Sequence, residues 1–168
     1  MFIVREIIKF IIFVLIQLFV FEKLIFFGFA MSFIYVSYLI LLPLNVARGY
    51  LMLIAFLLGL IIDMIYNTGG VHAFSSVFVA YFRPTILYKA VGERHISGKK
   101  ALVEVSDIKW NNMVVYSGLM ILIHHTLVLF VEASSFHLFF YTLLKVVSST
   151  LLSYILFLSF HYLLKKSK

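Results

Sequence analysis

The polar residues of this chain that could do chemistry lie inside apolar runs, and the clearest of them is Asp63. It lies in FLLGLIIDMIYNTGGVHAFSSVFVAYFRP, residues 56–84, where two apolar segments flank a Gly-Gly turn. A carboxylate placed there could bind a proton or an ion, or it could tie a helix hairpin together through hydrogen bonds. Transport usually needs several ionisable groups in series, whereas Asp63 is alone at a helix end. The structural role is therefore favoured.

The turn after Asp63 determines which residues could pair with this carboxylate. The turn suits the positive φ angles of a tight reversal and consists of Asn67, Thr68, Gly69 and Gly70. Folding the chain back there sets residue 63 level with about residue 74 of the returning helix. The residues expected at that depth are His72, Ser75 and Ser76.

Small residues lead up to Asp63. Ala55 and Gly59 precede it at intervals of four, so all three share one face of a helix. A face of this kind lets two helices approach closely, which would bury the carboxylate in protein and away from lipid.

Arg83 and Arg48 are candidates for fixing the opposite end of the same helices. Arg83 lies about one turn from the end of its helix, where it could extend to the interface or cap the turn PLNVAR, residues 43–48. Arg48 ends that turn. An anionic ligand for Arg83 is the alternative role.

Lys145 begins a polar stripe that continues through Ser149, Ser153 and His161 on one helix face. We expect this stripe to face the interior of a helix bundle. Lys145 is also a candidate partner for Asp63 or Glu132, and the sequence leaves open whether Asp63 pairs with His72, Ser76 or Lys145. Gln17 is expected to form a hydrogen bond between helices.

The pair His124-His125 resembles a metal site only at first sight. Adjacent residues of a helix point about 100° apart, and no further histidine or carboxylate follows at a ligand spacing. Catalytic patterns such as Gly-x-Ser-x-Gly or a phosphate-binding loop are also missing from the sequence. We expect no metal, no cofactor and no enzymatic activity.

The composition indicates the elements that must position these residues. The chain has 168 residues, of which 64% are hydrophobic and 12% charged, which is typical of an integral membrane protein. A hydrocarbon core roughly 30 Å thick needs about 20 residues of helix. The predicted spans of one all-α, six-helix domain are 3–21, 24–42, 49–66, 71–83, 110–131 and 137–164, with a polar loop at 92–109. Pro84 is expected to end or kink the fourth helix, and 85–91 to continue it at the interface.

The distribution of basic residues predicts the orientation. Of the 14 Lys and Arg residues, only Lys23 and Lys145 fall on the outer side if both termini are cytoplasmic. The net charge of +7 is therefore explained by topology at the bilayer, and nucleic-acid binding is not expected.

The segment LLPLNVARGYLMLIAFLLGLIIDMIYNTGGVHAFSSVFVAYFRP, residues 41–84, resembles the core of the rod shape-determining membrane protein family MreD. Residues 123–136, IHHTLVLFVEASSF, are similar to the end of the fifth helix in one branch of that family. Position 69, where close relatives would be expected to carry proline, is Gly69 here. The residues that carry the resemblance are Pro43, Asn45, Arg48, Gly59, Leu60, Asp63, Asn67, Gly70, His72, Ala73, Arg83 and Pro84.

The resemblance implies a non-enzymatic scaffold in the inner membrane of rod-shaped bacteria. Such a scaffold would bind MreC, a protein with one membrane helix and an outer domain. It would associate with the wall polymerase and transpeptidase of the elongation complex, and indirectly with the MreB filament. It would thereby support lateral peptidoglycan synthesis and the regulation of cell shape. Pairing of the bundle with a second copy is left open.

The family is also similar in fold to the substrate-binding subunits of energy-coupling-factor transporters, which defines the alternative function, vitamin capture. Those subunits typically carry an Ala-x-x-x-Ala face on the first helix, where a transporter scaffold docks. The first predicted helix here, FIVREIIKFIIFVLIQLFVF, has no small residue. The sequence thus favours the cell-shape scaffold.

Overall fold

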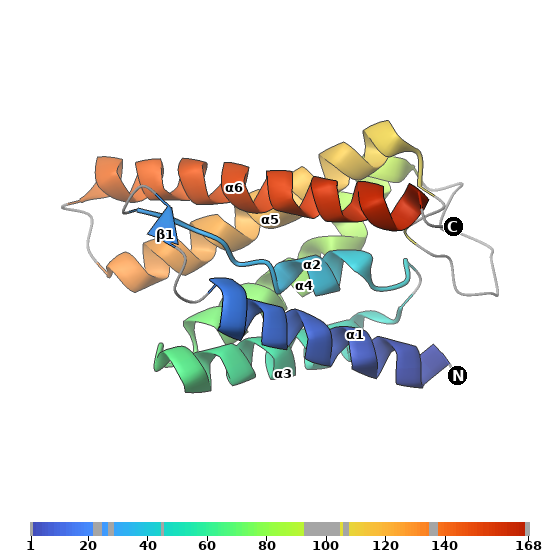
Figure 1. The fold of residues 1–168 in the computed structure, drawn as a ribbon, viewed down its shortest axis with the longest axis horizontal. Helices are drawn as coiled ribbons and strands as arrows, with labels where there is room; N and C mark the ends of the chain where they lie inside the picture. Colours follow the sequence, from blue (N-terminus) through green and yellow to red (C-terminus); the bar gives the residue numbers. More distant parts are fainter. Residues whose placement is uncertain are drawn as a thin grey trace.

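The computed structural model of the protein describes residues 2–21, 25–26, 29–44, 46–92, 105, 108–134 and 138–166. Its helices run roughly along one long axis, and both ends of the chain lie at the same end of the molecule (Figure 1). The all-helical class is confirmed, apart from one pair of two-residue strands. The elements are α1 (Phe2–Ile16), the π-helical turn η1 (Gln17–Phe21), β1 (Ile25–Phe26), β2 (Ala30–Met31), α2 (Val36–Leu41), α3 (Arg48–Tyr66), α4 (Val71–Val91), α5 (Trp110–Ala133) and α6 (Phe139–Lys166).

Among the residues that the structure describes, three helices, α3, α5 and α6, are long and apolar enough to cross a membrane. This is consistent with an integral membrane protein. Helix α5 lies centrally, because it packs against α4 on one side and α6 on the other. Large apolar side chains remain exposed along α1, α3 and α6, as expected for faces that meet lipid or another apolar partner.

The predicted helix over 24–42 is wrong for its first part. Ile25–Phe26 pairs antiparallel with Ala30–Met31, and the helix α2 begins only at Val36. Side chains from other elements supply the hydrogen bonds that a helix would have made internally. The Nε2 of Gln17 donates to the carbonyl of Ser32 (3.1 Å), and its Oε1 accepts the backbone N–H of Tyr35 (3.3 Å). These two backbone groups are therefore satisfied without a helix.

Of the two outcomes expected at Pro84, an end of the fourth helix is not observed, because α4 continues through Pro84 to Val91, as expected for residues 85–91. Proline removes one backbone donor, which leaves the carbonyl of Ala80 without its usual partner. Beyond the proline, Ile86, Leu87 and Val91 are buried in an apolar cluster. Their burial explains why the helix persists.

The core consists of two clusters that meet at α2. One cluster joins α1, the segment 33–42 and α3. The other joins α2, α4 and α5. Several sequence-based predictions lie outside the described residues: the link 22–23, Asn45, most of the loop 92–109, and residue 137.

Candidate functional site

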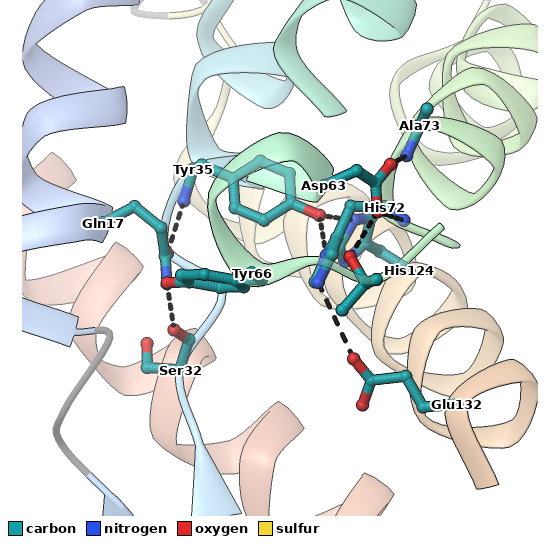
Figure 2. Close-up of polar contacts among 10 residues, drawn as sticks. Gln17, Ser32, Tyr35, Asp63, Tyr66, His72, Ala73, His124 and Glu132 are labelled. Atoms are coloured by element: carbon teal, nitrogen blue, oxygen red, sulfur yellow. Dashed lines mark hydrogen bonds and ion pairs between the residues drawn. The ribbon is translucent and has the colours of Figure 1, made fainter. Parts of the chain in front are cut away.

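Asp63 caps the first turn of α4 from the neighbouring helix α3. Its Oδ1 accepts hydrogen bonds from the Thr68 hydroxyl and from the backbone N–H of His72 (3.0 Å). Its Oδ2 accepts the backbone N–H of Ala73 (2.7 Å). The first N–H groups of a helix have no partner within it, and a negative charge is favourable there. The carboxylate therefore stabilises the start of α4 and joins both arms of the hairpin (Figure 2).

Gly59 is the point of closest approach between α3 and α4. A Cβ added there would lie 2.4 Å from the Cα of Ala73 and 2.5 Å from the carbonyl oxygen of His72. Both are backbone atoms, so no side chain can move aside to make room. Ala55 and Asp63 are buried on the same face of α3, in agreement with the expected close contact.

The turn between the two helices has the expected left-handed conformations. Asn67 ends α3 with φ of 55°, and the following Gly69 and Gly70 have φ of 62° and 99°. Only glycine adopts such angles without steric cost, while asparagine tolerates them better than most residues. This geometry brings residue 72 back to Asp63.

A buried Tyr35 joins two histidines from different helices. Its hydroxyl lies 2.9 Å from Nδ1 of His72 on α4 and 2.8 Å from Nε2 of His124 on α5. All three side chains are inaccessible to solvent. The ring of Phe33 packs edge-on against both imidazoles and shields them.

His72 connects this buried group to the end of α5. Its Nε2 lies 3.7 Å from Oε1 of Glu132, whose side chain is 31% exposed. In Figure 2, dashed lines lead from Glu132 to His72 and from His72 to the Tyr35 hydroxyl, which also meets His124.

His125 belongs to a different set of contacts from its neighbour His124. Its Nδ1 lies 2.9 Å from the carbonyl of Ile121, and its Nε2 lies 2.9 Å from Oγ of Ser153 on α6. Ser153 in turn meets Oγ of Ser32 at 3.1 Å. Within the described ranges no three His, Cys, Asp or Glu side chains are placed to hold a metal ion.

The pairing of Asp63 with Ser76 or Lys145, left open by the sequence, is not found among the described residues. Ser76 is fully buried, and its hydroxyl interacts with Tyr35. Lys145 places its Nζ 5.5 Å from the centre of the Tyr141 ring, one turn earlier on α6.

Arg83 is completely buried and caps the segment after α2. Its Nε donates to the Tyr116 hydroxyl (2.7 Å), while Nη1 and Nη2 donate to the carbonyls of Pro43 (3.1 Å) and Leu42. These carbonyls lie beyond the end of α2, where backbone oxygens lack helical donors. Arg48, by contrast, is exposed and lies 5.0 Å over the ring of Tyr81 on α4.

Comparisons with family models, with curated proteins and with solved structures found no match to this chain.

Sequence reasoning identified both ends of the α3–α4 hairpin and missed its buried centre. The sequence presents His124 only as half of an apparent metal pair, and it predicts a membrane helix around Tyr35. One signal in the sequence could have identified these two residues: several hydrogen-bonding side chains are expected at a similar depth in the helix bundle. A buried hydroxyl or imidazole needs a partner, so such side chains are expected to contact one another.

Proposed function

We propose that this protein is a non-enzymatic membrane scaffold of the bacterial cell-elongation complex, of the MreD kind. In this role it binds MreC in the inner membrane and supports lateral peptidoglycan synthesis. The proposal rests on the ordered residues of the resemblance between Pro43 and Pro84. The wall polymerase and the transpeptidase would join through this complex.

The observation that carries the proposal is that the resemblance residues hold helices together. Asp63 caps α4, Gly59 permits the close approach of α3, and Arg83 fixes the carbonyls after α2. A rigid bundle with apolar side chains exposed on its outer helices is suited to packing against a partner helix.

The proposal includes six membrane passes with both termini in the cytoplasm. The distribution of Lys and Arg supports this orientation, because only Lys23 and Lys145 would lie outside. In this proposal α1 and η1 form the first pass, and the segment 29–44, which is shorter than a full helical span, forms the second.

Affinity purification from native membranes in mild detergent, followed by mass spectrometry, tests the proposal. We expect recovery of a protein with one membrane helix and a large outer domain, together with wall-synthesis enzymes. An unrelated multi-pass protein with the same tag is the control. Recovery of a paired ATPase and a transporter scaffold would refute the proposal and indicate a vitamin-capture subunit.

A further inference from the structure

We propose that Glu132, His72, Tyr35 and His124 form a pH-sensitive hydrogen-bond relay between the end of α5 and the interior of the bundle. Each neighbouring pair presents a nitrogen and an oxygen to one another: 3.7 Å from Glu132 to His72, 2.9 Å from His72 to Tyr35, and 2.8 Å from Tyr35 to His124. The species bound is a proton, which the exposed Glu132 takes up from the aqueous phase. This inference is independent of the partners proposed above.

The direction of the hydrogen bonds in this chain is constrained by the single proton of the Tyr35 hydroxyl. Tyr35 can donate to one imidazole only and must accept from the other. The carboxylate of Glu132 favours a proton on Nε2 of His72, which leaves Nδ1 of His72 to accept from Tyr35. Tyr35 then accepts from Nε2 of His124.

This arrangement leaves Nδ1 of His124 as a bare acceptor. That atom is buried and has no hydrogen-bond partner within the described part of the chain. A buried polar atom without a partner is costly, so its presence calls for a physical reason. Capacity to take up a proton is such a reason. His125 differs, because both of its ring nitrogens have partners.

A second arrangement differs from the first by one proton. When Glu132 takes up a proton from water, it becomes a donor to Nε2 of His72, so the single proton of His72 lies on Nδ1 and is donated to the oxygen of Tyr35. The Tyr35 hydroxyl then donates to Nε2 of His124, whose single proton lies on Nδ1. Each imidazole loses one N–H bond and gains one by exchange with water during local opening, Tyr35 keeps one O–H bond, and the net change is one proton on Glu132. No imidazole is left charged inside the bundle, which avoids the penalty of burying an ion.

The 3.7 Å step between His72 and Glu132 is longer than a hydrogen bond. The Glu132 side chain is 31% exposed, so a change of rotamer or one bridging water closes this gap. Exposure of this carboxylate also gives the relay its access to water.

Several charged or titratable groups face the relay among the described residues. Asp63 accepts three hydrogen bonds from Thr68 and the backbone of α4 and lies beside His72. The positive charge of Lys145 acts on Glu132 from α6. The full set is Asp63 and Tyr66 from α3, His125 from α5 and Lys145 from α6.

Nitrogen-15 NMR of the histidine rings tests the relay in the full-length protein in detergent micelles. As the pH is lowered from about 8 to about 4, through the ordinary range of glutamate, we expect His72 and His124 to exchange their protonated and bare nitrogens together. His125 should keep one tautomer and provides an internal reference. A His124 tautomer that stays constant over this range in the unmodified protein would overturn the relay.

Two variants separate the relay from independent titration of each ring. Tyr35→Phe removes the central hydroxyl, so His72 should still respond to pH while His124 no longer does. Tyr154→Phe, which removes a hydroxyl bonded to Val114 elsewhere in the bundle, should leave the coupled exchange intact. If the His124 tautomer changes with pH to the same extent in Tyr35→Phe as in the unmodified protein, the proposed relay is wrong. The titration of the unmodified protein decides the matter even if a variant fails to fold.

Discussion

The Oδ2 of Asp63 accepts the backbone N–H of Ala73 at 2.7 Å, across the contact between α3 and α4. Two N–H groups of the first turn of α4 thus have their partner on another helix, ten residues or fewer away in sequence. This makes Asp63 a cap supplied by the neighbouring helix, and it explains how an acid can be stable in so apolar a chain.

Replacement of Asp63 should distinguish hydrogen bonding from charge. Asp63→Asn keeps one acceptor oxygen for α4 and should lower the melting temperature in detergent only slightly. Asp63→Leu leaves the N–H groups of His72 and Ala73 without partners and should destabilise the protein by about 1–3 kcal/mol. Thermal unfolding of the two purified variants provides the measurement. Equal stability of both, with loss of a bound ion, would contradict the capping role.

Replacement of Gly59 tests the close approach of the two helices. Gly59→Ala places a Cβ against the backbone of Ala73, so we expect a loss of about 1–3 kcal/mol. Gly49→Ala is the matched control, because Gly49 lies on the same helix and its Cβ would meet nothing within 4 Å. That control should be neutral or stabilising, since alanine is the better helix former. Similar melting temperatures for the two variants would show that α3 and α4 are farther apart.

The α3–α4 hairpin was predictable because its determinants are local. Two features determine this hairpin: the spacing of Ala55, Gly59 and Asp63 on one helix face, and the glycines of the turn. Both lie within one short stretch of sequence. The bend at 29–35 was not predictable, because Gln17 and Ser149 satisfy its backbone from distant positions. Apolar periodicity alone cannot reveal such partners, and a membrane helix is the default where none is known.

The same limit applies to the buried centre. Tyr35 meets His72 and His124 only after three segments have packed together. The position of His72 level with Asp63 follows from the chain reversal at Gly69. No feature of the hydrophobic pattern, in contrast, places residue 35 at the same level as residue 124.

Loss of Gln17 should therefore affect a bend that the sequence did not reveal. Gln17→Leu keeps the volume and apolar character but removes the donor to Ser32 and the acceptor for Tyr35. We expect a loss of about 1–3 kcal/mol for the buried groups left unpaired. Hydrogen exchange of the Tyr35 amide, measured by mass spectrometry of the 29–35 segment, should accelerate. Unchanged protection would mean that water replaces the glutamine.

Arg83 should be intolerant of replacement by lysine although the charge is kept. Lysine cannot reproduce the planar fork that contacts Tyr116, Pro43 and Leu42 together. Each hydrogen bond to a charged group is worth about 1.5–3 kcal/mol, so losing one or two should visibly lower the melting temperature. Arg48→Lys is the control, since Arg48 is exposed and its contact is with the Tyr81 ring. An unchanged melting temperature in Arg83→Lys would indicate that Arg83 acts through charge alone.

The proposed orientation leads to a last prediction. Reporter fusions at the C-terminus should be active only for a cytoplasmic reporter, and an insertion at Gly69 only for a reporter that works outside. Gly69 suits this insertion because no atom lies within 4 Å of the position its Cβ would take.

Replacing Lys99 and Lys100 with glutamine should leave this reporter pattern unchanged, because the remaining basic residues on that side still outnumber Lys23 and Lys145. The same change should weaken any contact made by the cytoplasmic face. A reversed reporter pattern in the unmodified protein would show that the charge argument is wrong, and the surfaces offered to MreC and to the cytoplasm would have to be exchanged.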